Sequence, residues 1–238
     1  MPVIICSELK MNKPVNQSFQ FNVRQQGDGL ALLRALADAR VRAVFFDPQY
    51  RGVLDKMKYG NEGQNRERAR HNLPQMTEDV IRMFLTEIDR VLVKNGYLFL
   101  WIDKFHLVEG IQSWFRDIHD LTPVDMIVWH KMKIGMGYRT RRASEYLVVL
   151  QKAPKTAKNS WLLHNIPDVW NEKIHGKSHT HTKPIGLQTE LIKAVCVDKD
   201  HDLVCDPASG SYSVLQACQR AQVNFIGCDL VYGAEAAT

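Results

Sequence analysis

Two short segments carry side chains able to do chemistry, and the first spans residues 45–50, Phe-Phe-Asp-Pro-Gln-Tyr. An apolar run here ends in the tetrapeptide Asp47-Pro48-Gln49-Tyr50. An aromatic amine is a poor nucleophile because its lone pair is delocalised, but a carboxylate and a proline carbonyl can each accept one of its hydrogen bonds. Such acceptors favour a pyramidal nitrogen able to attack a methyl sulfonium, while Tyr50 stacks on the base. The alternative interpretation is a proline-containing surface turn with no role in chemistry.

The second segment spans residues 204–211, Val-Cys-Asp-Pro-Ala-Ser-Gly-Ser. An apolar strand runs into a turn of small residues, which lets the backbone approach a ligand closely, and then into a helix whose first amides can bind a carboxylate. About 20 residues after Asp206, Asp229 ends the next apolar run, where an acid can bind both hydroxyls of a ribose. A nucleoside with an amino-acid tail, S-adenosylmethionine, suits both ends. The alternative is an ordinary turn ended by a solvated aspartate.

Hydrophobic periodicity predicts the elements that position these two segments. The predicted helices span residues 30–39, 77–93 (ended by Asn95-Gly96), 108–115, 184–197 and 214–221. The predicted strands span residues 41–46, 97–102, 124–130, 145–151, 203–205 and 224–228. Strands that alternate with helices imply an α/β fold with a doubly wound, mostly parallel sheet, here as a single domain over residues 1–238. Ligands bind such sheets at the carboxyl ends of strands, where Asp47, Asp206 and Asp229 all fall.

Bulk composition is compatible with this interpretation and narrows the class of protein. The chain has 238 residues, 45% of them hydrophobic, with a net charge of +5 that suits a polyanionic partner. Its five cysteines form no Cys-x-x-Cys pair, so no metal site is predicted and reduced thiols of a cytoplasmic protein are expected. Residues 1–10 lack the pattern of a signal peptide, and no run of about 18 apolar residues predicts a membrane span.

Together, the two motifs resemble those of the DNA amino-methyltransferases. In that family the tetrapeptide usually reads Asp-Pro-Pro-Tyr and the cofactor loop resembles Asp-Pro-Phe-x-Gly-Ser-Gly. The order of the motifs, with the tetrapeptide before the cofactor loop, is similar to the permuted arrangement of the beta class. The resemblance covers roughly residues 43–230 and includes residues 129–145 and the Lys183-Pro184 pair that opens a helix. It implies the Rossmann-like fold of methyltransferases that depend on S-adenosylmethionine.

The resemblance also implies roles for individual residues. Asp47, Pro48, Gln49 and Tyr50 would form the catalytic tetrapeptide that holds the target amine and base. The implied cofactor-binding residues are Asp47, Lys183, Pro184, Asp206, Ala208, Ser209, Gly210, Ser211 and Asp229. An aspartate at the first tetrapeptide position favours the N6 amine of adenine, because the cytosine-amine enzymes of the family more often begin with serine.

Four positions depart from the family pattern. Gln49 replaces the second proline, Ala208 the usual phenylalanine, Tyr212 a usual glycine and Thr182 the usual glutamine. These departures leave a catalytically silent DNA-binding subunit as one alternative. The others are an N4-cytosine enzyme, a methyltransferase of the same fold acting on RNA or on a protein amide, and a nucleotide-binding oxidoreductase. The absence of a Gly-x-Gly-x-x-Gly motif weakens the last.

The implied partner is duplex DNA, from which the target base must be flipped. Basic residues expected to contact phosphates are Arg51, Lys56, Lys58, Arg66, Arg68, Arg70, Arg139, Arg141 and Arg142. The first six lie in a predicted loop over residues 51–75, which we expect to close over DNA. A small target-recognition segment is expected over residues 152–178, where Trp161 and Trp170 are interpreted as core packing. The resemblance suggests a homodimer.

Overall fold

The computed structural model describes residues 18–49, 76–135, 139–174 and 182–233. Its helices are α1 (Gly29–Ala35), α3 (Glu78–Val91), α4 (Lys104–Glu109), the 3-10 turn η2 (Gln112–Phe115), α5 (Ile185–Val195) and α6 (Ser213–Ala221). Its strands are β1 (Val41–Phe46), β2 (Leu92–Ile102), β3 (Leu121–His130), β4 (Ser144–Lys152), β5 (Val169–Asn171), β6 (Leu203–Asp206) and β7 (Asn224–Gly227). Among these described residues, no helix is long and apolar enough to cross a membrane.

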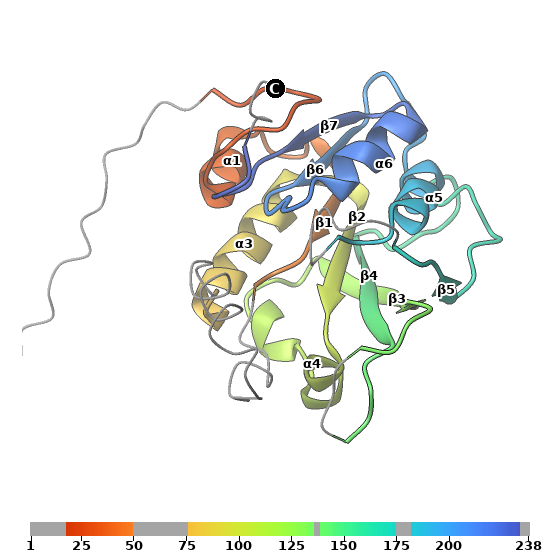
Figure 1. Ribbon diagram of the computed structural model, residues 1–238. Helices are drawn as coiled ribbons and strands as arrows, with labels where there is room; N and C mark the ends of the chain where they lie inside the picture. The colour runs from red at the N-terminus through yellow and green to blue at the C-terminus, as the bar shows by residue number, and fades with distance from the viewer. Residues whose placement is uncertain (1–17, 50–75, 136–138, 175–181, 234–238) are drawn as a thin grey trace, which may run out of the picture.

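The seven strands form one sheet in the order β5-β3-β4-β2-β1-β6-β7 (Figure 1). Strand β1 runs parallel to both β2 and β6, and β6 runs parallel to β7, whereas β4 is antiparallel to β2 and β3. Ile102 at the end of β2 pairs with Tyr146 near the start of β4, and His130 at the end of β3 pairs with Ser144. The ends of β1, β2, β3, β6 and β7 and the start of β4 therefore share one edge, the carboxyl edge. The predicted doubly wound, mostly parallel sheet is confirmed.

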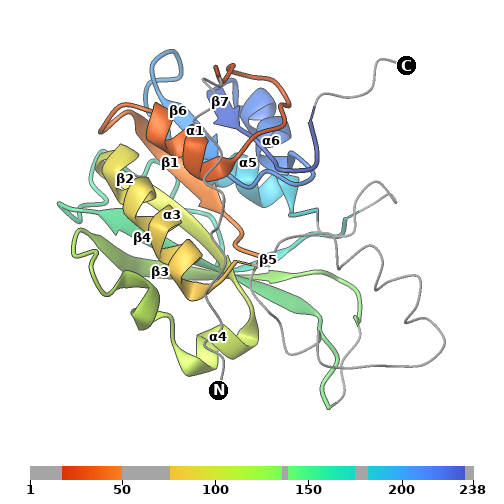
Figure 2. The same cartoon turned by 90° about the vertical axis from the view of Figure 1, so that its left-hand side faces the viewer.

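Helices cover both faces of the sheet: α1 and α3 one, α5 and α6 the other (Figures 1 and 2). Successive residues of β1 point to opposite faces, so its two phenylalanines serve two different cores. Phe45 stacks on Phe99 at 4.7 Å between ring centroids, in the core beneath α5 and α6. Phe46 stacks on Phe84 of α3 at 5.1 Å, in the core beneath α1 and α3. This two-sided burial explains the continuous apolar run before Asp47.

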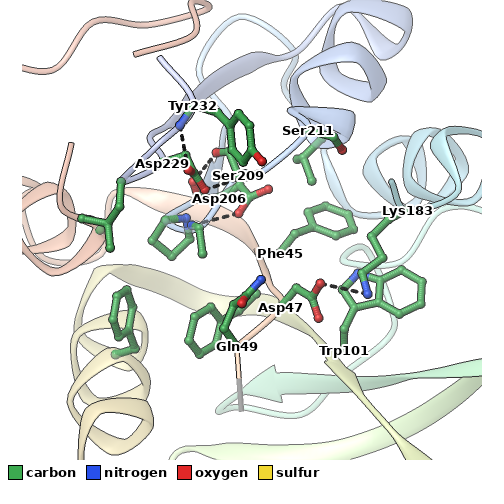
Figure 3. Close-up of a pocket in the computed structure, with 18 of the residues that line it drawn as sticks. Phe45, Asp47, Gln49, Trp101, Lys183, Asp206, Ser209, Ser211, Asp229 and Tyr232 are labelled. Carbon is green, nitrogen blue, oxygen red and sulfur yellow. Dashed lines mark hydrogen bonds and ion pairs between the residues drawn. The ribbon is translucent and has the colours of Figure 1, made fainter. Parts of the chain in front are cut away.

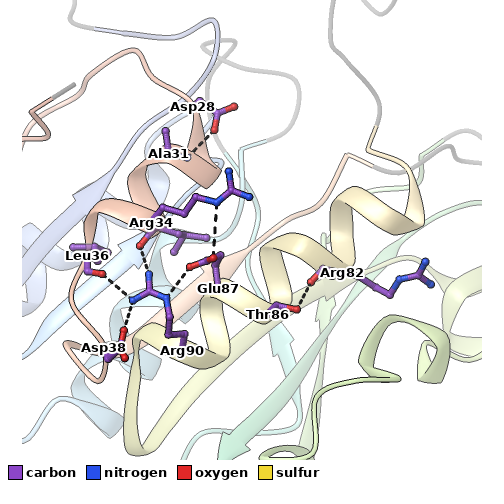
Figure 4. Close-up of polar contacts among 10 residues, drawn as sticks. Asp28, Ala31, Arg34, Leu36, Asp38, Arg82, Thr86, Glu87 and Arg90 are labelled. Carbon is purple, nitrogen blue, oxygen red and sulfur yellow. Dashed lines mark hydrogen bonds and ion pairs between the residues drawn. The ribbon is translucent and has the colours of Figure 1, made fainter. Parts of the chain in front are cut away.

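Two arginines link helix α1 to α3: Arg34 of α1 lies 3.8 Å from Glu87, and Arg90 makes the closer contacts (Figure 4). Arg90, in the last turn of α3, donates from Nη2 to the carbonyl oxygen of Leu33 at 2.8 Å and from Nη1 to that of Leu36 at 3.0 Å. Its Nε donates to Glu87 at 2.8 Å. The last carbonyls of a helix lack partners within it, and Arg90 supplies them for α1. The position of α1 beside the sheet therefore depends on α3.

Three details differ from the predictions made from sequence. The single helix predicted over residues 108–115 is wrong, because Gly110, at φ +87°, separates α4 from η2. The helix predicted over residues 77–93 ends at Val91, and Asn95, at φ +61°, lies within β2 instead of ending the helix. Strand β5 was not predicted: this edge strand of three residues is recognisable only from its pairing with β3.

Candidate active site

A cavity of about 360 Å³ lies at the carboxyl edge, where the ends of β1 and β6 meet (Figure 3). Most of the predicted tetrapeptide and cofactor residues line it. These are Asp47, Gln49, Lys183, Asp206, Ala208, Ser209, Gly210, Ser211 and Asp229. Pro48 and Pro184 are buried next to lining residues, and Tyr50 lies outside the described residues. The structure thus brings together two motifs that stand about 160 residues apart.

The turn after β6 is held in shape by its own polar groups. The carboxylate of Asp206 accepts a hydrogen bond from the backbone amide of Ala208 at 3.1 Å, and the hydroxyl of Ser209 donates to the carbonyl oxygen of Asp206 at 2.7 Å. Gly210 adopts φ +46°, and a Cβ atom there would meet nothing within 4 Å. Its backbone consequently presents an open cradle to the cavity, as an amino-acid tail of a ligand would require.

Asp229 is fixed by three backbone amides. Its Oδ2 accepts from the amide of Gly210 at 3.0 Å, and its Oδ1 accepts from the amides of Val231 and Tyr232, each at 2.9 Å. A carboxylate offers about four lone-pair sites, so with these three amides bound Asp229 keeps room for about one more hydrogen bond, from a ribose hydroxyl. The carboxylate that the sequence placed at a strand end is therefore oriented by the turn that follows it.

The cavity is electrostatically suited to a cation. The pKa of Asp206 is raised from 3.8 to about 8, mainly by burial and in addition by the nearby carboxylates of Asp47 and Asp229, against the Ala208 amide and Lys183, which lower it. A cationic ligand would relieve this repulsion between carboxylates. S-adenosylmethionine carries a sulfonium and an ammonium group, so the residues present fit the predicted cofactor.

Asp47 is held by a lysine. The Nζ atom of Lys183 lies 2.9 Å from Oδ2 of Asp47 and 2.8 Å from Oε2 of Glu145, and it sits 4.8 Å from the centre of the Trp101 ring. The other oxygen of Glu145 pairs with Lys131. Burial lowers the pKa of Lys183, but Asp47 and Glu145 together raise it well above its ordinary value. Lys183 is therefore a cation at every physiological pH.

Sequence reasoning missed several groups of this site. Asp28 and Gly29 of the α1 start line the cavity, and a Cβ atom on Gly29 would lie 2.1 Å from the carbonyl oxygen of Pro207. Asp28 and Gly29 had no motif to mark them. Glu145 and Trp101 stood at ends of predicted strands, which was a usable signal, but only the pairing of β2 with β4 brings them beside Lys183.

Tyr212, which replaces a usual glycine, adopts φ +59°, a conformation that glycine accepts without strain. Its ring is buried, and its hydroxyl shares a hydrogen between the carbonyl oxygens of Gln25, at 2.7 Å, and Tyr232, at 2.9 Å. The same hydroxyl accepts from the backbone amide of Gln25 at 3.1 Å. These contacts offset the strain and tie two distant segments to the rim of the cavity.

The basic residues divide into two groups. Arg139, Arg141 and Arg142 lie in the connection between β3 and β4, at the carboxyl edge, with Arg142 stacked 5.7 Å from the ring of Phe105. The other six predicted phosphate contacts, Arg51, Lys56, Lys58, Arg66, Arg68 and Arg70, lie outside the described residues. Trp161 and Trp170 pack against the core beneath α5, as predicted.

Comparison with known sequences gives consistent matches. A family model for N6 and N4 methyltransferases, described as DNA methylase, matches residues 41–234. The type II methyltransferase M.HhaII of Haemophilus parahaemolyticus is 57% identical over 212 residues, which cover 89% of this chain and 92% of that protein. The type II methyltransferase M.Cfr9I of Citrobacter freundii is 26% identical, with 86% of this chain and 82% of that protein covered.

Solved structures share the fold at low sequence identity. The cytosine-N4-specific PvuII DNA methyltransferase superposes with a TM-score of 0.64 at 16% identity, covering 86% of this chain and 80% of that one. The putative DNA modification methylase TTHA0409 of Thermus thermophilus, complexed with S-adenosyl-L-methionine, superposes with a TM-score of 0.56 at 20% identity. The match covers 87% of this chain and 88% of that one. These likenesses support the sheet order and its helical cover.

Proposed function

The chain belongs to the N6/N4 DNA methylase family, and on that premise we propose that it methylates the N6 amine of adenine in duplex DNA. Membership of the family makes the protein a DNA methyltransferase that uses S-adenosylmethionine. The observation that carries the proposal is the position of Asp47, which lines the same cavity as Asp206 and Asp229. A group that can hold an amine therefore faces groups that can hold the methyl donor.

In this proposal, the cofactor is held by the carboxyl ends of β6 and β7. The carboxylate of Asp229 accepts a ribose hydroxyl, while Asp206 and the turn of small residues that follows it hold the amino-acid tail. When bound, S-adenosylmethionine supplies an electrophilic methyl group. Asp28 and Gly29 close the cavity from the side of α1.

The target amine is prepared by the tetrapeptide. The carboxylate of Asp47 and the carbonyl oxygen of Pro48 each accept a hydrogen bond from the amine, which draws its lone pair out of conjugation with the ring. Lys183 keeps Oδ2 of Asp47 in place, at 2.9 Å, so the carboxylate is oriented before the base arrives. Tyr50 would stack on the flipped base.

Adenine is preferred in this proposal because the tetrapeptide begins with aspartate. The cytosine-amine enzymes of the family more often begin with serine, whose hydroxyl is a weaker acceptor than a carboxylate. We further propose that the chain serves a restriction-modification system, as the type II designation of M.HhaII suggests, and that it assembles as a homodimer.

Recognition of DNA is assigned to three parts of the single domain. Arg139, Arg141 and Arg142 at the carboxyl edge would contact phosphates beside the cavity. Residues 51–75 would supply further phosphate contacts, and residues 152–178, which include β5, would form the target-recognition segment. Phosphate contacts give affinity, so choice of sequence would fall mainly to the last of these.

The test is transfer of labelled methyl from S-adenosylmethionine to unmethylated duplex DNA, followed by nucleoside analysis. Labelled N6-methyladenine is expected from the wild-type chain and none from Asp47→Ala. Asp125→Ala removes an exposed carboxylate of β3 and should leave the product unchanged. Labelled N4-methylcytosine would overturn the choice of base, and transfer only to RNA or protein would overturn the DNA substrate. An undiminished Asp47→Ala variant would remove Asp47 from the reaction.

A further inference from the structure

Four charged side chains from four different elements form a continuous chain of contacts behind Asp47. Lys131 follows β3 and pairs with Glu145 of β4, Glu145 pairs with Lys183, and Lys183 pairs with Asp47 after β1. Figure 3 shows Lys183 reaching Asp47 from beside the Trp101 ring. We propose that Glu145 is a positioning residue for methyl transfer, because it holds Lys183 in the place from which Lys183 orients Asp47. This inference rests on the proposed role of Asp47 as the acceptor for the target amine.

The geometry explains why Lys183 needs a second carboxylate. A lysine ammonium is a compact charge on a flexible stem, so one contact alone does not fix its position. Here Nζ lies 2.8 Å from Glu145 and 2.9 Å from Asp47, with the face of Trp101 at 4.8 Å as a third contact. These three contacts meet at one atom and come from three different segments of the chain. The position of Nζ is consequently fixed by the protein and does not depend on Asp47 alone.

Sharing the ammonium also affects Asp47 as an acceptor. A lysine that had only Asp47 as its anion would concentrate its charge on that carboxylate and compete with the target amine for its lone pairs. Glu145 takes part of that charge, and it is itself balanced by Lys131. Two cations and two anions therefore neutralise one another across the chain. Asp47 therefore keeps its orientation, and its carboxylate can still accept a hydrogen bond from the target amine.

The charge balance between Lys183 and Glu145 has a large effect because both side chains are mostly buried. The side chains of Lys183 and Glu145 are 13% and 28% exposed, so water screens their attraction only partly. The titratable groups around Lys183 are Asp47 after β1, Glu145 of β4 and Asp206 of β6, while Lys131 after β3 acts through Glu145. Without the negative charge of Glu145, burial and the nearby Lys131 would still disfavour the charged form of Lys183, and less negative charge would remain to favour it. The pKa of Lys183 should then fall.

The test uses Glu145→Gln, which keeps the shape and an acceptor oxygen but removes the charge. Single-turnover methyl transfer is measured with saturating cofactor and DNA near neutral pH. We expect the rate to fall at least about tenfold, because Asp47 loses its fixed orientation. Glu145→Asp, which retains the charge, should recover most of that loss.

A matched control is available on the neighbouring helix. Glu190 of α5 pairs with Lys193 at the same distance, 2.8 Å, but both side chains are substantially exposed. Glu190→Gln removes an equivalent charge and should change the rate less than about twofold. A Glu145→Gln variant that behaves like this control would overturn the proposal. So would a Glu145→Asp variant as slow as Glu145→Gln, since the charge at this position would then not matter.

A second measurement needs no turnover. The ammonium group of Lys183 is observed at neutral pH by NMR with ¹⁵N-labelled lysine in the wild-type, Glu145→Gln and Glu190→Gln chains, and its signal is assigned as the one missing from Lys183→Met. We expect faster exchange of its ammonium protons with water only in Glu145→Gln, and an unchanged exchange rate there would overturn the proposal. If Asp47→Ala were fully active while the exchange rate rose in Glu145→Gln, the proposed function of Asp47 would fail although the contact between Glu145 and Lys183 is real. The two failures are therefore distinguishable.

Discussion

The hydroxyl oxygen of Tyr212 lies 2.7 Å from the carbonyl oxygen of Gln25, a residue 187 positions earlier in the chain. A buried ring at the start of α6 thereby fastens the segment that precedes α1, and α1 in turn contributes Asp28 and Gly29 to the cavity. The family's usual glycine could satisfy the backbone conformation at this position but could not make this contact. The departure at Tyr212 is therefore structurally accommodated.

Tyr212→Phe should weaken both stability and cofactor binding. The change leaves the backbone groups of Gln25 and the carbonyl of Tyr232 without this hydroxyl, at a cost of about 1–3 kcal/mol in the free energy of unfolding. Urea denaturation measures the loss, and calorimetric titration with S-adenosylmethionine measures the affinity. Tyr146→Phe, whose hydroxyl makes a longer 3.4 Å contact with Ser144, is the control. Equal effects in the two variants would contradict the role given to Tyr212.

The raised pKa of Asp206 predicts a specific dependence of stability on pH. In the unfolded chain this carboxyl ionises near 3.8, and in the folded chain at about 8, so the folded state holds a proton that the unfolded state has lost. The contribution is fully present below the unfolded value and is lost as pH rises through about 8. Asp206→Asn should therefore gain stability relative to wild type as pH rises, as followed by thermal denaturation at several pH values.

The same group should release a proton when the cationic cofactor binds, because the cation favours the ionised carboxylate. Calorimetric titrations in buffers of different ionisation enthalpy count that proton. Near pH 7, wild type should release more protons than Asp206→Asn. Equal proton release in the two chains would mean that Asp206 is already ionised in the cofactor-free protein.

Arg90→Ala should destabilise the fold through α1. The variant removes the Arg90 donor from the carbonyl oxygens of Leu33 and Leu36 and from the carboxylates of Glu87 and Asp38, although Leu33 keeps the amide of Leu36 and Glu87 keeps Arg34. We expect a loss of about 1–3 kcal/mol in the free energy of unfolding by urea denaturation. Arg82→Ala breaks an ion pair with the exposed Asp79 within α3 and should cost about 0.5 kcal/mol. If Arg90→Ala cost no more than Arg82→Ala, the link between α1 and α3 would be unimportant.

Arg139→Ala should weaken DNA binding without changing which sequence is methylated. An exposed arginine at the carboxyl edge that contacts one phosphate contributes about 0.9 to the slope of log affinity against log salt concentration. Fluorescence anisotropy over a range of salt concentrations measures that slope. Arg220 serves as the control. It lies in the last turn of α6, at the opposite end of that helix from the residues that line the cavity. An unchanged slope in Arg139→Ala would place the DNA elsewhere.

Local sequence was enough to identify the chemistry of this protein. An apolar run that ends in a carboxylate is a property of a few neighbouring residues, so the strand ends at Asp47, Asp206 and Asp229 could be predicted, and with them the cavity at one edge of the sheet. Family resemblance added the pairing of the two motifs and the expected roles of individual residues. Strand and helix periods also predicted most elements, because burial on one or both faces imposes those periods.

Tertiary structure decided which distant groups complete the site. Gly29 reaches the turn at Pro207 because α1 packs against α3, and Glu145 reaches Lys183 because β4 pairs with β2. Strand β5 exists only as a partner of β3. Order and register in a sheet arise from hydrogen bonds and packing between segments far apart in the chain, whereas a sequence pattern records each segment's own burial. For that reason the sequence predicted the carboxylates, and only the fold assigned their neighbours.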